Sequence, residues 1–97
     1  MIRLYLTSTV YRIRPTRDQW GEVSTTASTL LMARVEWGTR VVIGRAGEEV
    51  VSQAMVLLAP ETVIQPEDLL RIDGVDYPVK TWRREADFSN RVMRVFI

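Results

Sequence analysis

The chain contains no cysteine and no histidine. Without cysteine it has no disulfide framework and no thiolate for nucleophilic or redox chemistry. Without histidine it lacks the most common zinc ligand and the usual general base near neutral pH. These absences exclude the usual kinds of zinc site and cysteine catalysis, and we expect no metal and no cofactor.

Long apolar runs are absent as well. The longest is AMVLLA at residues 54–59, whereas a membrane-spanning helix needs about 20 apolar residues. The opening MIRLYLTST lacks the apolar region of a signal peptide. We therefore expect a protein that is made in the cytoplasm and has no membrane partner. A chain of 97 residues, 46% of them hydrophobic, predicts one folded domain over residues 1–97.

Lysine is nearly missing, because twelve of the 13 basic residues are arginine. Arginine suits interfaces and bidentate contacts, although a codon bias of the host explains the same composition. The net charge is only +1, yet residues 1–17 and 80–94 are basic and residues 61–76 are acidic. This layout favours another copy of the chain as partner, with an assembly that weakens in salt. The candidates for charge pairs between subunits are Arg12, Arg14, Arg17, Asp68, Asp73, Asp76, Arg83 and Arg84.

Residue types that carry catalysis are also scarce. The serines lie in no nucleophile elbow and in no Ser-x-x-Lys pattern. Neighbouring carboxylates occur at Glu48–Glu49, Glu67–Asp68 and Asp73/Asp76. Solvation of a loop or the flank of a turn explains each of these pairs better than an acid–base pair does. We expect no catalytic residue and no enzyme.

Turn signals divide the chain into short apolar segments typical of β-strands. They lie at residues 9–14, 29–37, 50–58, 69–82 and 91–97, with 25–29 as a lead-in or edge and 84–90 as a turn. Asp73-Gly74 stands between alternating apolar residues, which is among the strongest hairpin signals in a sequence. The pattern predicts an all-β fold, a small β-barrel of about six short strands whose closure removes sheet edges.

Residues 38–49 form the most unusual segment, a predicted projecting loop between the second and third strands. Its apolar strip, residues 41–43, costs about 25 cal/mol per Å² if left in water. The loop either folds back on its own barrel or pairs with a neighbouring copy by strand addition, and we expect the second. Its candidates for oligomer and channel contacts are Gly38, Arg40, Val41, Val42, Ile43, Gly44, Arg45, Gly47, Glu48 and Glu49.

The order of several motifs resembles one protein family over residues 9–97. The motifs are RDQWGE at 17–22, RVEW at 34–37, GEEVVSQAMVLL at 47–58, IQPEDL at 64–69, DGVDYPV at 73–79, the pair Arg83-Arg84 followed by Asp87, and a final VMRVFI. In this order they resemble the head-closure proteins of long-tailed bacteriophages, also called stoppers or head–tail joining proteins.

The resemblance implies a small β-barrel that assembles as a ring in the neck of the virion. The portal and its adaptor protein would lie above the ring, and the tail-terminator and tail proteins below it. The 38–49 loop would point toward the channel and help to retain packaged double-stranded DNA. Assembly would take place in the host cytoplasm, and the family has no shared catalytic residue.

Two alternatives stay open. One is a tail-terminator or another tail-proximal ring protein. The other is a small nucleic-acid-binding β-barrel, in which Tyr11 beside Arg12 and Arg14, or Trp82 beside Arg83 and Arg84, would stack on bases. The isoelectric point of 8.2 lies below the value of about 9 typical of such domains.

Overall fold

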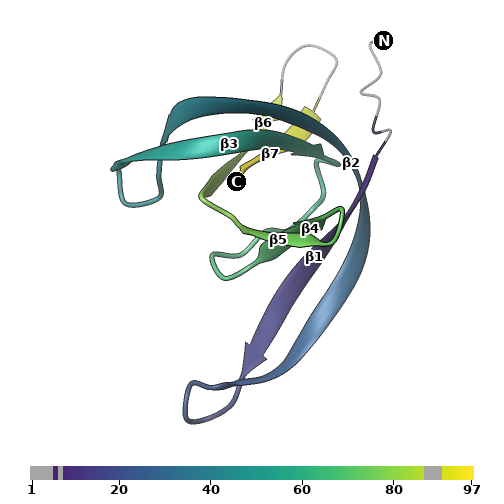
Figure 1. Ribbon diagram of the computed structural model, residues 1–97, viewed down its shortest axis with the longest axis vertical. Coiled ribbons are helices and arrows are strands. Elements are labelled where there is room, and N and C mark those ends of the chain that lie inside the picture. The colour runs from purple at the N-terminus through teal and green to yellow at the C-terminus, as the bar shows by residue number, and fades with distance from the viewer. Residues whose placement is uncertain (1–5, 7, 87–90) are drawn as a thin grey trace.

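The computed structural model describes residue 6 and residues 8–86 and 91–97, and the predicted all-β class is confirmed. The strands in these ranges are β1 (Ser8–Arg17), β2 (Val23–Ile43), β3 (Glu49–Leu58), β4 (Leu69–Ile72), β5 (Val75–Pro78), β6 (Thr81–Ala86) and β7 (Arg91–Phe96) (Figure 1). This part of the chain contains no helix, and so none long and apolar enough to span a membrane.

The seven strands form one antiparallel sheet in the order β5-β4-β1-β2-β3-β7-β6. The sheet curls until β4–β5 and β6–β7 lie on facing sides of a common interior (Figure 1). Its two outermost strands, β5 and β6, follow one another in the chain with only residues 79–80 between them. The result is the barrel-like shape that the sequence predicts, but the sheet of the described residues stays open, with β5 and β6 as unpaired edges, so the predicted closure is wrong.

Strand β3 carries the core because apolar side chains cover both of its faces. Ala54, Val56 and Leu58 point into the curled interior, where the buried cluster also includes residues of β1, β4 and β7. Met55 and Leu57 point to the other face and pack with residues of β7. This two-sided burial explains why the sequence is continuously apolar there.

The predicted Asp73-Gly74 hairpin is confirmed. Ile72 pairs with Val75, and the two residues between them have φ angles of +50° and +79°. Positive φ at both central positions is the hallmark of a type I′ turn, which matches the twist of the flanking strands. The predicted closing strand is β7, and residues 87–90 of the predicted second turn lie outside the described residues.

The predicted loop at 38–49 is wrong. Strand β2 continues through Gly38 to Ile43 and pairs with β3 from Arg40↔Ser52 to Ile43↔Glu49. Only residues 44–48 form the turn. The register of the pairing with β3 shifts between Trp37 and Arg40, and Gly38 lies within this irregularity. The β-branched residues facing each other across the two strands favour pairing over a loop. We call residues 40–52 the β2–β3 arm.

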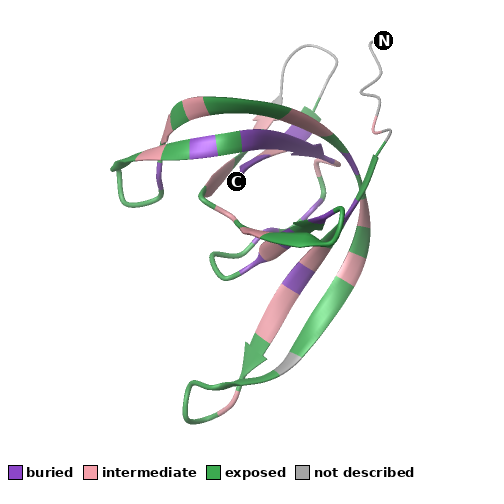
Figure 2. Cartoon of the chain, viewed as in Figure 1, coloured by how far each residue is buried: buried purple, intermediate pink, exposed green. Residues whose placement is uncertain are grey.

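The segments 25–29 and 29–37 are also parts of this one strand of 21 residues. The first half of β2 pairs with β1 from Arg17↔Val23 to Ser8↔Ala33. The outer end of this hairpin, residues 14–26, extends beyond the curled body and is named the β1–β2 arm (Figure 1). Exposed residues predominate along the outer ends of both arms, whereas buried ones gather on the strands around the interior (Figure 2).

The burial pattern predicts unequal costs for two leucine truncations. Leu58 is fully buried in the main cluster, and Leu30 on β2 is exposed. Leu58→Ala should lower the free energy of unfolding by about 2–5 kcal/mol, and Leu30→Ala by about 0.5 kcal/mol or less. Urea denaturation measures both, and equal losses would show that the curled interior is not the core.

Candidate functional site

The exposed apolar side chains of the β2–β3 arm form the candidate site. Val41, Ile43 and Val51 are 63%, 60% and 61% exposed. Val41 and Val51 are direct partners across the two strands, and Ile43 lies two residues further along, so the three share one face. We call these three residues the apolar strip. A contiguous exposed apolar group of this kind is a candidate contact surface.

The opposite face of the arm packs against the chain's own barrel. Val42 contacts the cluster that contains Met55 and Phe96. The Nη1 atom of Arg40 lies 3.8 Å from the Met55 sulfur. The arm is therefore held in place from one side, and its strip stays uncovered within the described residues.

The tip of the arm is fixed by two contacts. The guanidinium carbon of Arg45 lies 3.8 Å from the centroid of the Trp82 ring, a cation–π contact that joins the tip to β6. The Gly44 amide donates a hydrogen bond of 2.7 Å to the Glu48 carbonyl. Arg45 therefore contacts its own subunit through the Trp82 ring.

The charge candidates are paired mainly within one chain, and the central pair is buried. Arg14 donates two hydrogen bonds to the carboxylate of Asp68, at 2.9 and 2.8 Å. The Asp68 side chain is fully buried, and it also accepts a hydrogen bond of 2.8 Å from the Gln65 amide. This pair fixes β1 to the loop before β4, and it leaves Asp68 unavailable to another subunit.

The environment of Asp68 determines the direction of its titration. Burial alone raises the pKa of the carboxyl group. The hydrogen bonds from Arg14 and Gln65, with the charges of Arg14 and Arg12, outweigh burial and hold the pKa below 3.8, its ordinary value. The same pair raises the pKa of Arg14.

The remaining candidates follow the same pattern. Arg17 pairs with Glu67 at 3.1 Å, and Arg71 pairs with Asp76 at 2.7 Å, both on the surface. The hydrogen bond from Arg71 lowers the pKa of Asp76. Two arginines of the basic segment 1–17 are thus paired with two carboxylates of the acidic segment 61–76 inside one subunit. Arg14, Arg17 and Asp68 are therefore not free for pairs between subunits, whereas the wider prediction, with 80–94 as a second basic patch, stays a prediction.

The other arginines and Asp73 have local roles. Arg12 donates to the Val63 carbonyl at 2.9 Å, and Arg84 donates to the Thr62 carbonyl at 3.2 Å. Arg83 forms an ion pair with Glu85 and stands over the Phe96 ring at 5.5 Å. Asp73 occupies the first central position of the β4–β5 turn.

These contacts weaken the nucleic-acid alternative. Tyr11 is exposed, but its neighbours Arg12 and Arg14 are bonded to other parts of the chain. The ring of Trp82 already carries Arg45. Neither aromatic–arginine group is an open platform on which a base stacks.

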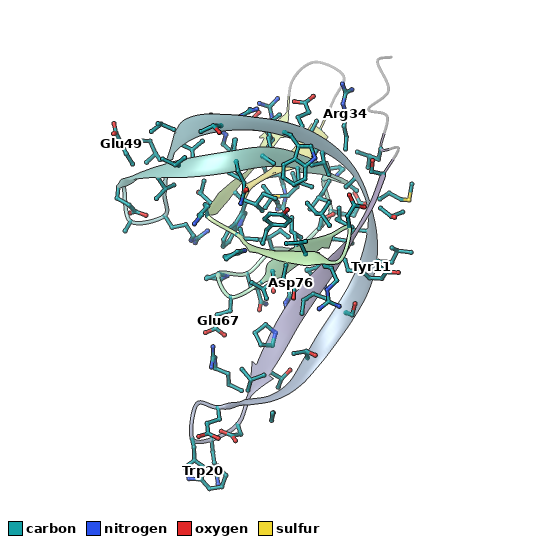
Figure 3. The ribbon with its side chains drawn as sticks, viewed as in Figure 1. Tyr11, Trp20, Arg34, Glu49, Glu67 and Asp76 are labelled. Atoms are coloured by element: carbon teal, nitrogen blue, oxygen red, sulfur yellow. The ribbon has the colours of Figure 1, made fainter. Side chains whose placement is uncertain are left out.

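The structure adds one residue that the sequence reasoning missed as a site. Trp20 lies at the tip of the β1–β2 arm and is 77% exposed (Figure 3). The sequence indicates a turn at RDQWGE, but a large aromatic residue in the centre of a turn was a usable signal. Turn positions favour small polar residues, so a tryptophan there needs a separate reason.

Comparison with family models, curated proteins and solved structures finds no match to this chain. Within residues 6, 8–86 and 91–97, no three acidic side chains come together as a possible metal site. The exposed apolar side chains of the two arms are the candidate contact surfaces.

The buried Arg14–Asp68 pair and the exposed Arg17–Glu67 pair allow a matched test. Arg14→Ala leaves a buried carboxylate without its cation and should lower the free energy of unfolding by about 3–5 kcal/mol. Arg17→Ala removes a surface partner and should lower it by about 0–1 kcal/mol. Chemical denaturation at neutral pH compares the two variants. Similar small losses in both would mean that Asp68 is solvated.

The lowered pKa of Asp68 predicts a pH dependence of stability. The stabilisation from its carboxylate is complete above the unfolded-state pKa of 3.8 and is lost as pH falls through the lower folded-state pKa. Asp68→Asn should therefore be less stable than the native chain at pH 7, with a gap that narrows below pH 3.8. Denaturation curves across the acid range measure the gap, and a gap independent of pH contradicts the assignment.

Proposed function

We propose that this chain is a subunit of the head–tail connector ring in the neck of a long-tailed bacteriophage. In this role it joins the portal and its adaptor to the tail and helps to retain packaged double-stranded DNA. It is a structural protein of the virion and not an enzyme. The observation that carries the proposal is the apolar strip of Val41, Ile43 and Val51, held outward on an arm that its own barrel anchors.

The strip favours self-assembly for an energetic reason. Full burial of one valine or isoleucine side chain contributes about 1.5–3 kcal/mol. Three such side chains on one face of a strand pair supply a substantial part of a contact between subunits. In a ring the same contact recurs at each boundary, so a moderate gain per contact becomes a large total.

The mechanism of a connector is positional, and the fold suits it. The curled sheet supplies a compact wall, and the two arms extend from this wall in different directions (Figure 1). A subunit in a ring needs two different complementary surfaces, and separate arms offer them. Since Arg45 stacks on Trp82, we assign the β2–β3 arm to contacts between subunits before any contact with DNA.

The location of the chain in the particle tests the function directly. Gold-labelled antibodies against this chain should mark the junction of head and tail in electron micrographs of the phage that encodes it. Particles assembled without the chain should lose packaged DNA or fail to join tails. Label along the tail, away from the neck, would favour a tail-proximal ring protein. Absence from purified particles would refute a virion role.

Polar substitutions on the strip should weaken assembly without unfolding the chain. Ile43→Thr combined with Val51→Thr keeps β-branched shapes and removes exposed apolar surface. We expect subunit association to weaken at least tenfold, or about 1.4 kcal/mol, with stability changed by about 0.5 kcal/mol or less. Sedimentation velocity across a concentration series measures association.

Val63→Thr is the matched control, because Val63 is also exposed but lies in the loop before β4. It should leave association unchanged. Equal effects of Val63→Thr and the strip variant would show that the strip has no special role in assembly.

A further inference from the structure

The turn that carries Trp20 is ordered by its own hydrogen bonds. The Asp18 carboxylate accepts bonds from the amides of Trp20 (2.9 Å) and Glu22 (3.1 Å). The Asp18 amide donates to the Glu22 carbonyl at 2.8 Å, and the Gly21 amide donates to the Asp18 carbonyl at 3.0 Å. Arg17 donates to the Gly21 carbonyl at 2.9 Å. A turn ordered in advance loses little conformational entropy when its exposed indole meets a partner.

A small pocket lies beside the β2–β3 arm, at the other end of β2. Its volume is about 240 Å³, and it is lined by Val41, Val42, Ile43, Thr81, Arg83 and Phe96. Pockets for drug-sized ligands measure about 300–1,000 Å³. A space of this size suits a single large side chain better than a soluble metabolite.

The charges around the two features are complementary. Arg83 lines the pocket, and it shares the carboxylate of Glu85 with Arg94, so these three side chains carry a net charge of +1. Asp18 and Glu22 flank Trp20, while the cation of Arg17 is already paired with Glu67. An acidic tip with an aromatic centre therefore matches a pocket that Val42 and Phe96 line beside a net positive charge.

The two features lie too far apart to meet within one chain. Trp20 marks the lower end of the molecule, and Glu49 marks the turn of the β2–β3 arm at the upper left (Figure 3). The molecule is 48 Å long, and β2 runs continuously between the two arms. A tryptophan that fills the pocket must therefore come from another copy.

We propose that Trp20 of one subunit inserts into the pocket of the next subunit, between residues 41–43 and Phe96. The proposal rests on the proposed function, because it names the contact by which connector subunits join. The two surfaces differ, so the contact is heterologous and generates a closed ring where the rotation closes. Buried tryptophans are frequent hot spots of interfaces. Trp20→Ala should weaken association by about 30-fold or more.

The absence of cysteine makes a selective crosslinking test possible. Gln19→Cys places a thiol beside the tip, and Thr81→Cys places one at the pocket, next to Phe96. In concentrated purified protein, a short bis-maleimide should link the double variant into a ladder of multimers on denaturing gels. Each single variant should stop at dimers. Adding Trp20→Ala to the double variant should abolish the ladder.

Gln19→Cys with Val75→Cys is the matched control, since Val75 is exposed on the separate β4–β5 turn. A ladder no stronger than this control, or a ladder unaffected by Trp20→Ala, overturns the proposed contact. The two proposals fail separately. If the ladder forms but the chain is absent from virions, the neck function is refuted and the contact stands. If the chain is found in the neck but no ladder forms, the function stands and the proposed contact is refuted.

Discussion

The length of β2 is the constraint on which the rest of this structure depends. One strand of 21 residues pairs with β1 along its first half and with β3 along its second. The curled body uses only the middle of this strand. Both ends therefore extend as hairpins, one bearing Trp20 and the other bearing the strip of Val41, Ile43 and Val51. A shorter β2 would give a similar barrel without the two arms.

Charged side chains and exposed apolar side chains have different roles in this molecule. The arginines of β1 are used within the fold, above all in the buried pair of Arg14 and Asp68 that ties β1 to the loop before β4. The exposed pair of Arg17 and Glu67 contributes little to stability. The exposed apolar side chains of the arms are left as the features suited to contacts between subunits. An arginine-rich sequence therefore does not by itself indicate a nucleic-acid partner.

Local patterns predicted the parts of the fold that depend on neighbouring residues. The Asp73-Gly74 turn, the apolar strand β3 and the closing strand β7 were all readable, because turn chemistry and burial leave short-range signals. The glycines at 38 and 44 led to the wrong prediction of a loop, because the pairing of β2 with β3 outweighs the backbone flexibility of these glycines. The pairing of Arg14 with Asp68, 54 residues apart, and the exposure of Trp20 depend on topology, which one sequence does not show.

The central claim is that sister subunits cover the apolar strip. A density map of the assembled oligomer tests it most directly, because the arm and its surroundings are then seen together. The account predicts that Val41, Ile43 and Val51 of each subunit lie in contact with side chains of the adjacent copy. Strips that face open solvent in every subunit, or that are covered only by their own chain, would contradict it.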